Sequence, residues 1–111
     1  MAENVVQTGG WTFLTNHGHA LICLARRPDA VMREVAAEIG ITERSLHNIV
    51  SDLEASGALT RDREGRRNRY TIHQDQPLRH PVESHCTVGE LITMVEKLSG
   101  RNPATGKSKS R

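Results

Sequence analysis

Short polar side chains and one arginine recur at helical spacing within residues 43–56. Arg44, Asn48 and Ser51 are four and three residues apart, so they share one face of a helix, with His47 on its flank. The opposite face is apolar and consists of Leu46, Ile49, Val50 and Leu53. Arginine can pair with guanine, asparagine with adenine, and serine with a base or a phosphate. This short, polar, cationic face therefore favours base reading in a DNA groove, and the alternative is an ordinary solvated surface.

The start of the same helix carries hydroxyl groups. Thr42 is a good N-cap, and Ser45 follows within the first turn. Backbone N–H groups at a helix start also point toward anions, so both residues are candidates for phosphate contacts. Arg33, near the start of the preceding helix, fits a phosphate contact or a plain exposed arginine equally well.

A second cationic group lies between residues 61 and 69, where five arginines stand against Asp62 and Glu64. The sequence Glu64-Gly65 indicates a turn, which would place Arg66, Arg67 and Arg69 near the tip of a hairpin. Arginines on such a turn suit a narrow minor groove or phosphates. The alternative is a charged hairpin that only keeps the protein in solution.

The elements that must position these residues follow from periodicity and capping. We expect helices over about 18–27 with Asn16 as N-cap, 32–39 ending at Gly40, and 43–56 ending at Gly57. Strands are expected over 58–63 and 68–72, and a short strand or an extended anchor over 11–14. A connector over 74–86 leads to a helix over 87–98, opened by the capping box of Thr87 and Glu90.

This order predicts a mainly α fold with a small β-hairpin wing (α+β), a winged helix-turn-helix with an additional C-terminal helix. Residues 11–99 would form one domain, with a flexible N-terminus over 1–10 and a disordered basic tail over 100–111. The recognition helix would be 43–56 and the wing 58–73.

Residues 33–72, REVAAEIGITERSLHNIVSDLEASGALTRDREGRRNRYTI, resemble the winged helix-turn-helix of MarR-like and ArsR-like bacterial regulators. The helix-turn-helix segment AAEIGIT, the helix end LEASGALTR and the arginine-rich EGRRNRYTI carry the resemblance, and PLRHPVESHCTVGELI is similar to the tail of short actinobacterial members. The resemblance implies a sequence-specific regulator of transcription whose partner is double-stranded DNA. The similarity to ArsR-like regulators also implies metal sensing as an alternative, because members of that group often use pairs of cysteine and histidine.

The last expected helix has a wide apolar stripe, formed by Val88, Leu91, Ile92, Val95 and Leu98. This stripe either packs on its own domain or pairs with a second copy. Small regulators read palindromic DNA as two-fold dimers, which favours a homodimer.

Other chemistry has little support in the sequence. The histidines and the two cysteines show no metal-ligand spacing, so no metal and no cofactor are expected, although metal sensing and redox sensing at Cys86 stay open as alternatives. No catalytic motif is present. A small-molecule effector stays open as an alternative, although no residue pattern supports it. We expect a buried Cys23 and a cytoplasmic protein without a membrane span. The rival function is a winged helix that binds another protein instead of DNA.

Overall fold

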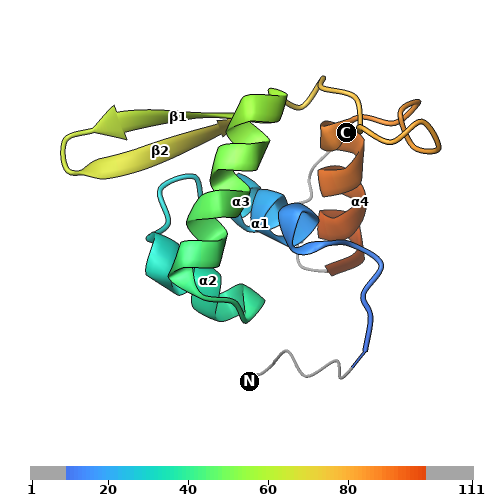
Figure 1. The fold of residues 1–111 in the computed structure, drawn as a ribbon. Coiled ribbons are helices and arrows are strands. Elements are labelled where there is room, and N and C mark those ends of the chain that lie inside the picture. Colours follow the sequence, from blue (N-terminus) through green and yellow to red (C-terminus); the bar gives the residue numbers. More distant parts are fainter. Residues whose placement is uncertain (1–9, 100–111) are drawn as a thin grey trace. The chain divides into compact units, whose positions relative to one another are not determined.

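Three helices, an antiparallel hairpin and a final helix follow one another along the chain (Figure 1). The computed structural model describes residues 10–99, and residues 97–99 by their backbone alone. The elements are α1 (Asn16–Arg26), α2 (Met32–Ile39), α3 (Glu43–Ser56), β1 (Leu59–Glu64), β2 (Arg67–Ile72) and α4 (Val88–Ser99). This arrangement is the expected mainly α, winged-helix-like α+β fold. The chain divides into two compact units, with the boundary between Ile72 and His73, and each unit is described by itself.

The core of the first unit is built mainly from aliphatic side chains, and β2 contributes the buried Tyr70. Helix α1 packs against α2, α3 and β2, and α3 packs against α1, α2 and β1. The largest fully buried side chains are Leu24, Leu46, Leu59, Val35 and Val50. The apolar stripe predicted for α3 is buried throughout. Burial of this stripe turns the polar stripe of the same helix outward.

The start of α1 differs from the prediction. The helix begins at Asn16, two residues earlier than expected, and Thr15 takes the place of the N-cap. The Thr15 side chain accepts a hydrogen bond from the Gly18 backbone N–H at 3.4 Å. Asn16 is the first helical residue, and its side-chain oxygen lies 3.1 Å from His19 Nδ1. Both residues are good caps, and Thr15 has the extended backbone that a cap requires.

Residues 11–14 form neither of the expected structures. They have no strand assignment, and the Trp11 and Phe13 side chains are 74% and 92% exposed, so they anchor nothing in the core. Their rings stack edge to face, with 4.9 Å between the centroids. Residues 11–14 pair with no strand of the described part of the chain, and both of their aromatic side chains therefore lie at the surface.

Helices α2 and α3 each end at a glycine, as predicted. Gly40 follows α2 and Gly57 follows α3, with φ of 93° and 89°, in the left-handed region. The N–H groups of both glycines bond back to the preceding helix, at Ala36 O and at Glu54 O and Leu53 O. The first glycine makes the short turn to α3, and the second starts the chain toward the hairpin.

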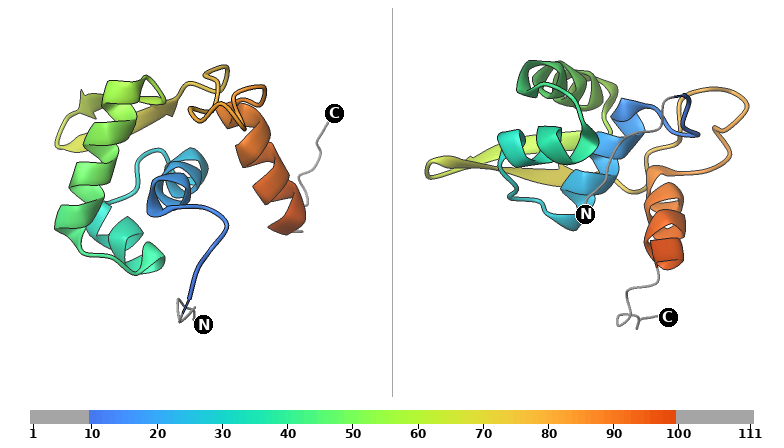
Figure 2. Two further views of the ribbon diagram at one scale, coloured as in Figure 1. Left: turned by 45° about the vertical axis from the view of Figure 1, so that its right-hand side comes forward. Right: turned by 90° about the horizontal axis from the view of Figure 1, so that it is seen from below.

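The hairpin extends beyond the three helices in Figures 1 and 2. Its register pairs Leu59 with Ile72 at the base and Glu64 with Arg67 at the tip. β1 therefore has the expected length but begins and ends one residue later than expected, and β2 begins one residue earlier. The turn is Gly65-Arg66 instead of Glu64-Gly65, with Gly65 at a φ of +63°. At the base, the Tyr70 N–H donates to Pro28 O at 2.9 Å, which ties the hairpin to the segment after α1.

The second unit consists of the connector and α4. The expected capping box is present: the Thr87 N–H donates to Glu90 Oε1 at 2.8 Å, and the Glu90 N–H donates to Thr87 Oγ1 at 3.2 Å. The connector folds back on the helix start, where the Val88 and Gly89 N–H groups donate to Gln76 O and Gln74 O at 2.9 Å.

Replacing Gly89 with alanine is expected to loosen this junction. An added Cβ would lie 2.9 Å from Gln74 Cβ and 3.0 Å from its carbonyl oxygen, so the connector would have to move. We expect a local cost of about 1–2 kcal/mol, seen as faster amide exchange at residues 88 and 89. Thr93→Ala, on the exposed side of α4, is the control, and equal exchange in both variants would contradict the close approach.

Candidate nucleic-acid interface

The start of α3 is held by its own hydroxyl groups. Thr42 Oγ1 accepts from the Ser45 backbone N–H at 3.0 Å and donates to Ser45 Oγ at the same distance. Both side chains are exposed. The predicted cap is therefore confirmed, and the two hydroxyls stand together at the positive end of the helix dipole.

The outward row of α3 is Arg44, Asn48 and Ser51, and all three side chains are exposed. They stand opposite the buried stripe, and no ion pair of the described residues involves Arg44. A guanidinium, an amide and a hydroxyl are thus presented side by side from a helix whose other face is held in the core. Such a row can donate and accept hydrogen bonds at the edges of base pairs.

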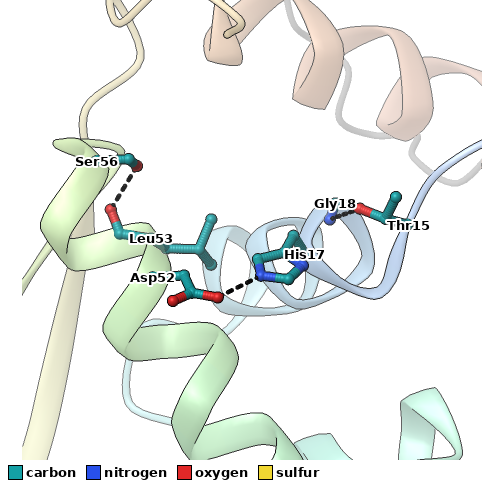
Figure 3. A network of polar contacts seen from close by, with 6 residues as sticks. All are labelled: Thr15, His17, Gly18, Asp52, Leu53 and Ser56. Atoms are coloured by element: carbon teal, nitrogen blue, oxygen red, sulfur yellow. Dashed lines mark hydrogen bonds and ion pairs between the residues drawn. The ribbon is translucent and has the colours of Figure 1, made fainter. Parts of the chain in front are cut away.

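The charge of α3 differs from the cationic face that the sequence suggested. The helix contains one arginine against three carboxylates, so its formal charge is −2 when His47 is neutral. The carboxylates lie on the flanks of the outward row, and each pairs with a basic side chain, two with histidines and one with an arginine. Asp52 Oδ2 lies 2.8 Å from His17 Nε2 of α1 (Figure 3).

The other two carboxylates are paired on the other flank. Glu54 Oε1 accepts from Arg61 Nη2 of β1 at 3.2 Å, and Glu43 Oε2 lies 3.6 Å from His47 Nε2 one turn along the helix. Sequence reasoning missed the role of His17, which is 35 residues from Asp52, because no local pattern links them. The ion pair between Arg61 and Glu54 of α3 was not predicted from the sequence either.

The predicted wing arginines differ in how closely acidic side chains compensate their charges. Arg67 lies opposite Glu64 and Arg69 lies opposite Asp62, so each of these arginines has an acidic neighbour across the strands. Arg66 lies in the turn, outside the paired strands, and is exposed. Of the predicted wing arginines, Arg66 therefore has the least local compensation of its charge.

Arg33 is exposed near the start of α2, beside Glu34 in the same helical turn. No ion pair within residues 10–99 holds the Arg33 side chain. Its position is compatible with both of the interpretations given above.

The two cysteines are in different surroundings. Burial in α1, and to a smaller extent the Glu38 carboxylate, raise the pKa of the Cys23 thiol to about 11. Cys23 is thus the expected buried thiol, protonated at neutral pH. Cys86 is half-buried, and neither cysteine is in a disulfide. Within the described ranges no three histidine, cysteine or acidic side chains are grouped closely enough to hold a metal ion.

The apolar stripe of α4 is only partly at the surface. Val88 and Ile92 are buried within the single chain, while Leu91 and Val95 are half-buried. The side chain of Leu98 lies outside the described residues. Met94, which the predicted stripe did not include, is 51% exposed. Among residues 10–99 no helix has the length and apolar character that a bilayer crossing requires.

Comparisons of the chain with models of protein families and with curated proteins found no match. The resemblance to MarR-like and ArsR-like regulators therefore stays a prediction from the motifs of residues 33–72.

Proposed function

We propose that this chain is a sequence-specific, double-stranded DNA-binding regulator of transcription. The observation that carries the proposal is the exposed row of Arg44, Asn48 and Ser51 on α3, directly opposite that helix's buried stripe. In this proposal the N-terminal half of α3 enters the major groove, where the row and His47 read bases. The clustered hydroxyls of Thr42 and Ser45 meet the phosphates.

The hairpin adds contacts outside the major groove. Arg66 at the tip reaches a minor groove or phosphates, and Arg67 and Arg69 contribute less because Glu64 and Asp62 lie opposite them. Arg33 adds a phosphate contact from α2.

A homodimer is part of the proposal. Two copies would present two α3 helices to the halves of a palindromic site. Because Val88 and Ile92 are already buried, the contact through α4 would depend mainly on Leu91, Val95 and Met94.

The experiment that tests the function measures binding of the full chain to the DNA upstream of its own gene and to a random duplex, across a salt series. We expect a preference of about a thousandfold for the specific site, and a salt dependence equivalent to several phosphate contacts. Absence of binding to both duplexes at low salt would overturn the proposal.

Arg66→Ala tests the wing. We expect it to weaken binding to specific and random DNA by the same factor and to reduce the salt slope by about one, because one phosphate contact is lost. Arg26→Ala removes an equal charge from the exposed end of α1 and serves as the control. A loss confined to the specific site would instead assign base reading to Arg66.

The rival function, a protein-interaction module, has one observation in its favour. Trp11 and Phe13 are exposed together, and aromatic side chains are typical centres of protein interfaces. A stable complex with a protein partner that Trp11→Ala and Phe13→Ala abolish, in a chain that binds neither duplex, would support it. The outward row of α3 contains no aromatic or large apolar side chain, so it does not favour this reading.

A further inference from the structure

The charge of α3 poses a problem for its proposed role. Glu43, Asp52 and Glu54 place three negative charges on the helix, and Arg44 is its one arginine. DNA phosphates repel unpaired carboxylates, so a helix with a formal charge of −2 would approach a duplex poorly. The partners of these carboxylates therefore decide the electrostatic character of the interface.

Two of the three partners are imidazoles. Asp52 pairs with His17 at 2.8 Å (Figure 3), and Glu43 pairs with His47 at 3.6 Å, whereas Glu54 pairs with Arg61. An arginine keeps its charge at any physiological pH, but the charge of a histidine changes between about pH 5 and 8. Both histidine side chains are close to half-exposed, so water and DNA can both reach them.

Other charged groups on the packed elements do not replace these partners. Among residues 10–99, each of the two histidines has one ion pair, and it is with the carboxylate named above. Glu38 of α2 is held by Arg27, and Arg61 of β1 is held by Glu54. The remaining charged residues of α2, β1 and β2 form no ion pair with either histidine and are Arg33, Glu34, Asp62, Arg63, Glu64, Arg67 and Arg69.

The net charge of α3 together with its partners His17 and Arg61 depends on whether His17 and His47 are protonated. With both histidines neutral, α3 with His17 and Arg61 has two cations against three carboxylates, a formal charge of −1. With both protonated it has four cations against three carboxylates, a charge of +1. The sign of the formal charge around the outward row thus depends on whether the two imidazoles carry protons.

We propose that DNA binding by this chain is coupled to proton uptake at His17 and His47, so that affinity for duplex DNA rises as the pH falls from 8 to 6. The inference rests on the proposed DNA-binding function and adds a regulation of the same site. The phosphates favour the cationic imidazoles, so the complex binds more protons than the free protein. By linkage, the association constant must then fall as the pH rises.

The first test measures affinity for the specific and random duplexes at pH 6, 7 and 8 at constant ionic strength. We expect binding to be about tenfold tighter at pH 6 than at pH 8. Calorimetric titration in two buffers with different ionisation enthalpies gives the number of protons taken up. We expect an average of about 0.5 proton per bound chain between pH 6 and 8, the uptake that corresponds to a tenfold change over two pH units. Equal affinities at the three pH values, or no proton uptake, would overturn the inference.

Variants of the pair formed by His17 and Asp52 distinguish proton linkage from a purely structural role of this pair. His17→Gln is expected to reduce the ratio of affinities at pH 6 and pH 8 to about threefold, because one of two linked protons is lost. Asp52→Asn is expected to raise the affinity at pH 8 several-fold, because it removes a negative charge beside the DNA-facing row. If the pair only fastened α1 to α3, both variants would lower affinity equally at all three pH values, and the inference would be wrong.

The control is His85→Gln, which removes an exposed histidine of the connector that forms no ion pair in the described part of the chain. It is expected to keep the wild-type ratio. Failure of the inference is distinct from failure of the proposed function. Binding without pH dependence rejects the proton linkage alone, whereas absence of binding to either duplex at every pH rejects both.

Discussion

Leu46→Ala is expected to lower the free energy of unfolding by about 3 kcal/mol. The Leu46 side chain is 0% exposed and lies on the face of α3 that packs against α1 and α2. Truncation removes buried apolar surface and leaves a cavity that a small core cannot refill without moving its helices. Urea denaturation followed by circular dichroism measures the loss, which is a large fraction of the stability of a protein of this size.

Asn48→Ala provides the matched control for Leu46→Ala. It is on the same helix, two residues away, and its side chain is exposed. Because alanine has the higher helix propensity and no packing is lost, we expect a change in stability within about 0.5 kcal/mol. Equal destabilisation by the two variants would contradict the assignment of the buried and outward faces of α3.

Arg44→Ala is expected to weaken binding to the specific DNA site by about 1–3 kcal/mol, a loss of roughly five- to 150-fold. Arg44 is the one arginine of α3, it is exposed, and it is in the first turn, the part of the helix that enters a major groove in the proposed function. A guanidinium that bonds guanine O6 and N7 distinguishes base pairs, so its removal must reduce preference as well as affinity. Competition between specific and random duplexes measures both.

Arg26→Ala is again the matched control, because it removes the same charge from α1 and leaves α3 unchanged. It should lower affinity slightly and leave the preference for the specific site unchanged. If Arg44→Ala weakened the specific and the random duplex by the same factor, Arg44 would be a phosphate contact and the base-reading role would be rejected. Unfolding curves for both variants show whether a change in affinity comes from loss of structure.

The local structure was predictable because its signals lie within a few residues of one another. The bounds of α2 and α3, the left-handed Gly40 and Gly57, and the capping box at Thr87 all follow from side-chain spacing and backbone preference. The same local reasoning was wrong at the start of α1. Thr15 and Asn16 are adjacent good caps, and the sequence alone does not say which of them has the extended backbone.

The outward row of α3 could likewise be derived from the sequence, because helical periodicity places Arg44, Asn48 and Ser51 opposite the apolar stripe. The partners of the flanking carboxylates could not be derived from the sequence. The pairing of Asp52 with His17 joins positions 35 residues apart, and that of Glu54 with Arg61 crosses from a helix into a strand. Both depend on how α1 and β1 pack against α3.

By itself, then, the sequence determined the order of the helices and strands and which side of each helix is apolar, because both follow from local periodicity and capping. Tertiary structure alone decided which charges remain uncompensated at the candidate interface, because ion pairs depend on distances between atoms of different elements. The tertiary structure also places Trp11 and Phe13 at the surface, although their apolar, aromatic side chains favour burial. Apolar character favours a core, but only the packing of the other elements decides whether the core has room for a given side chain.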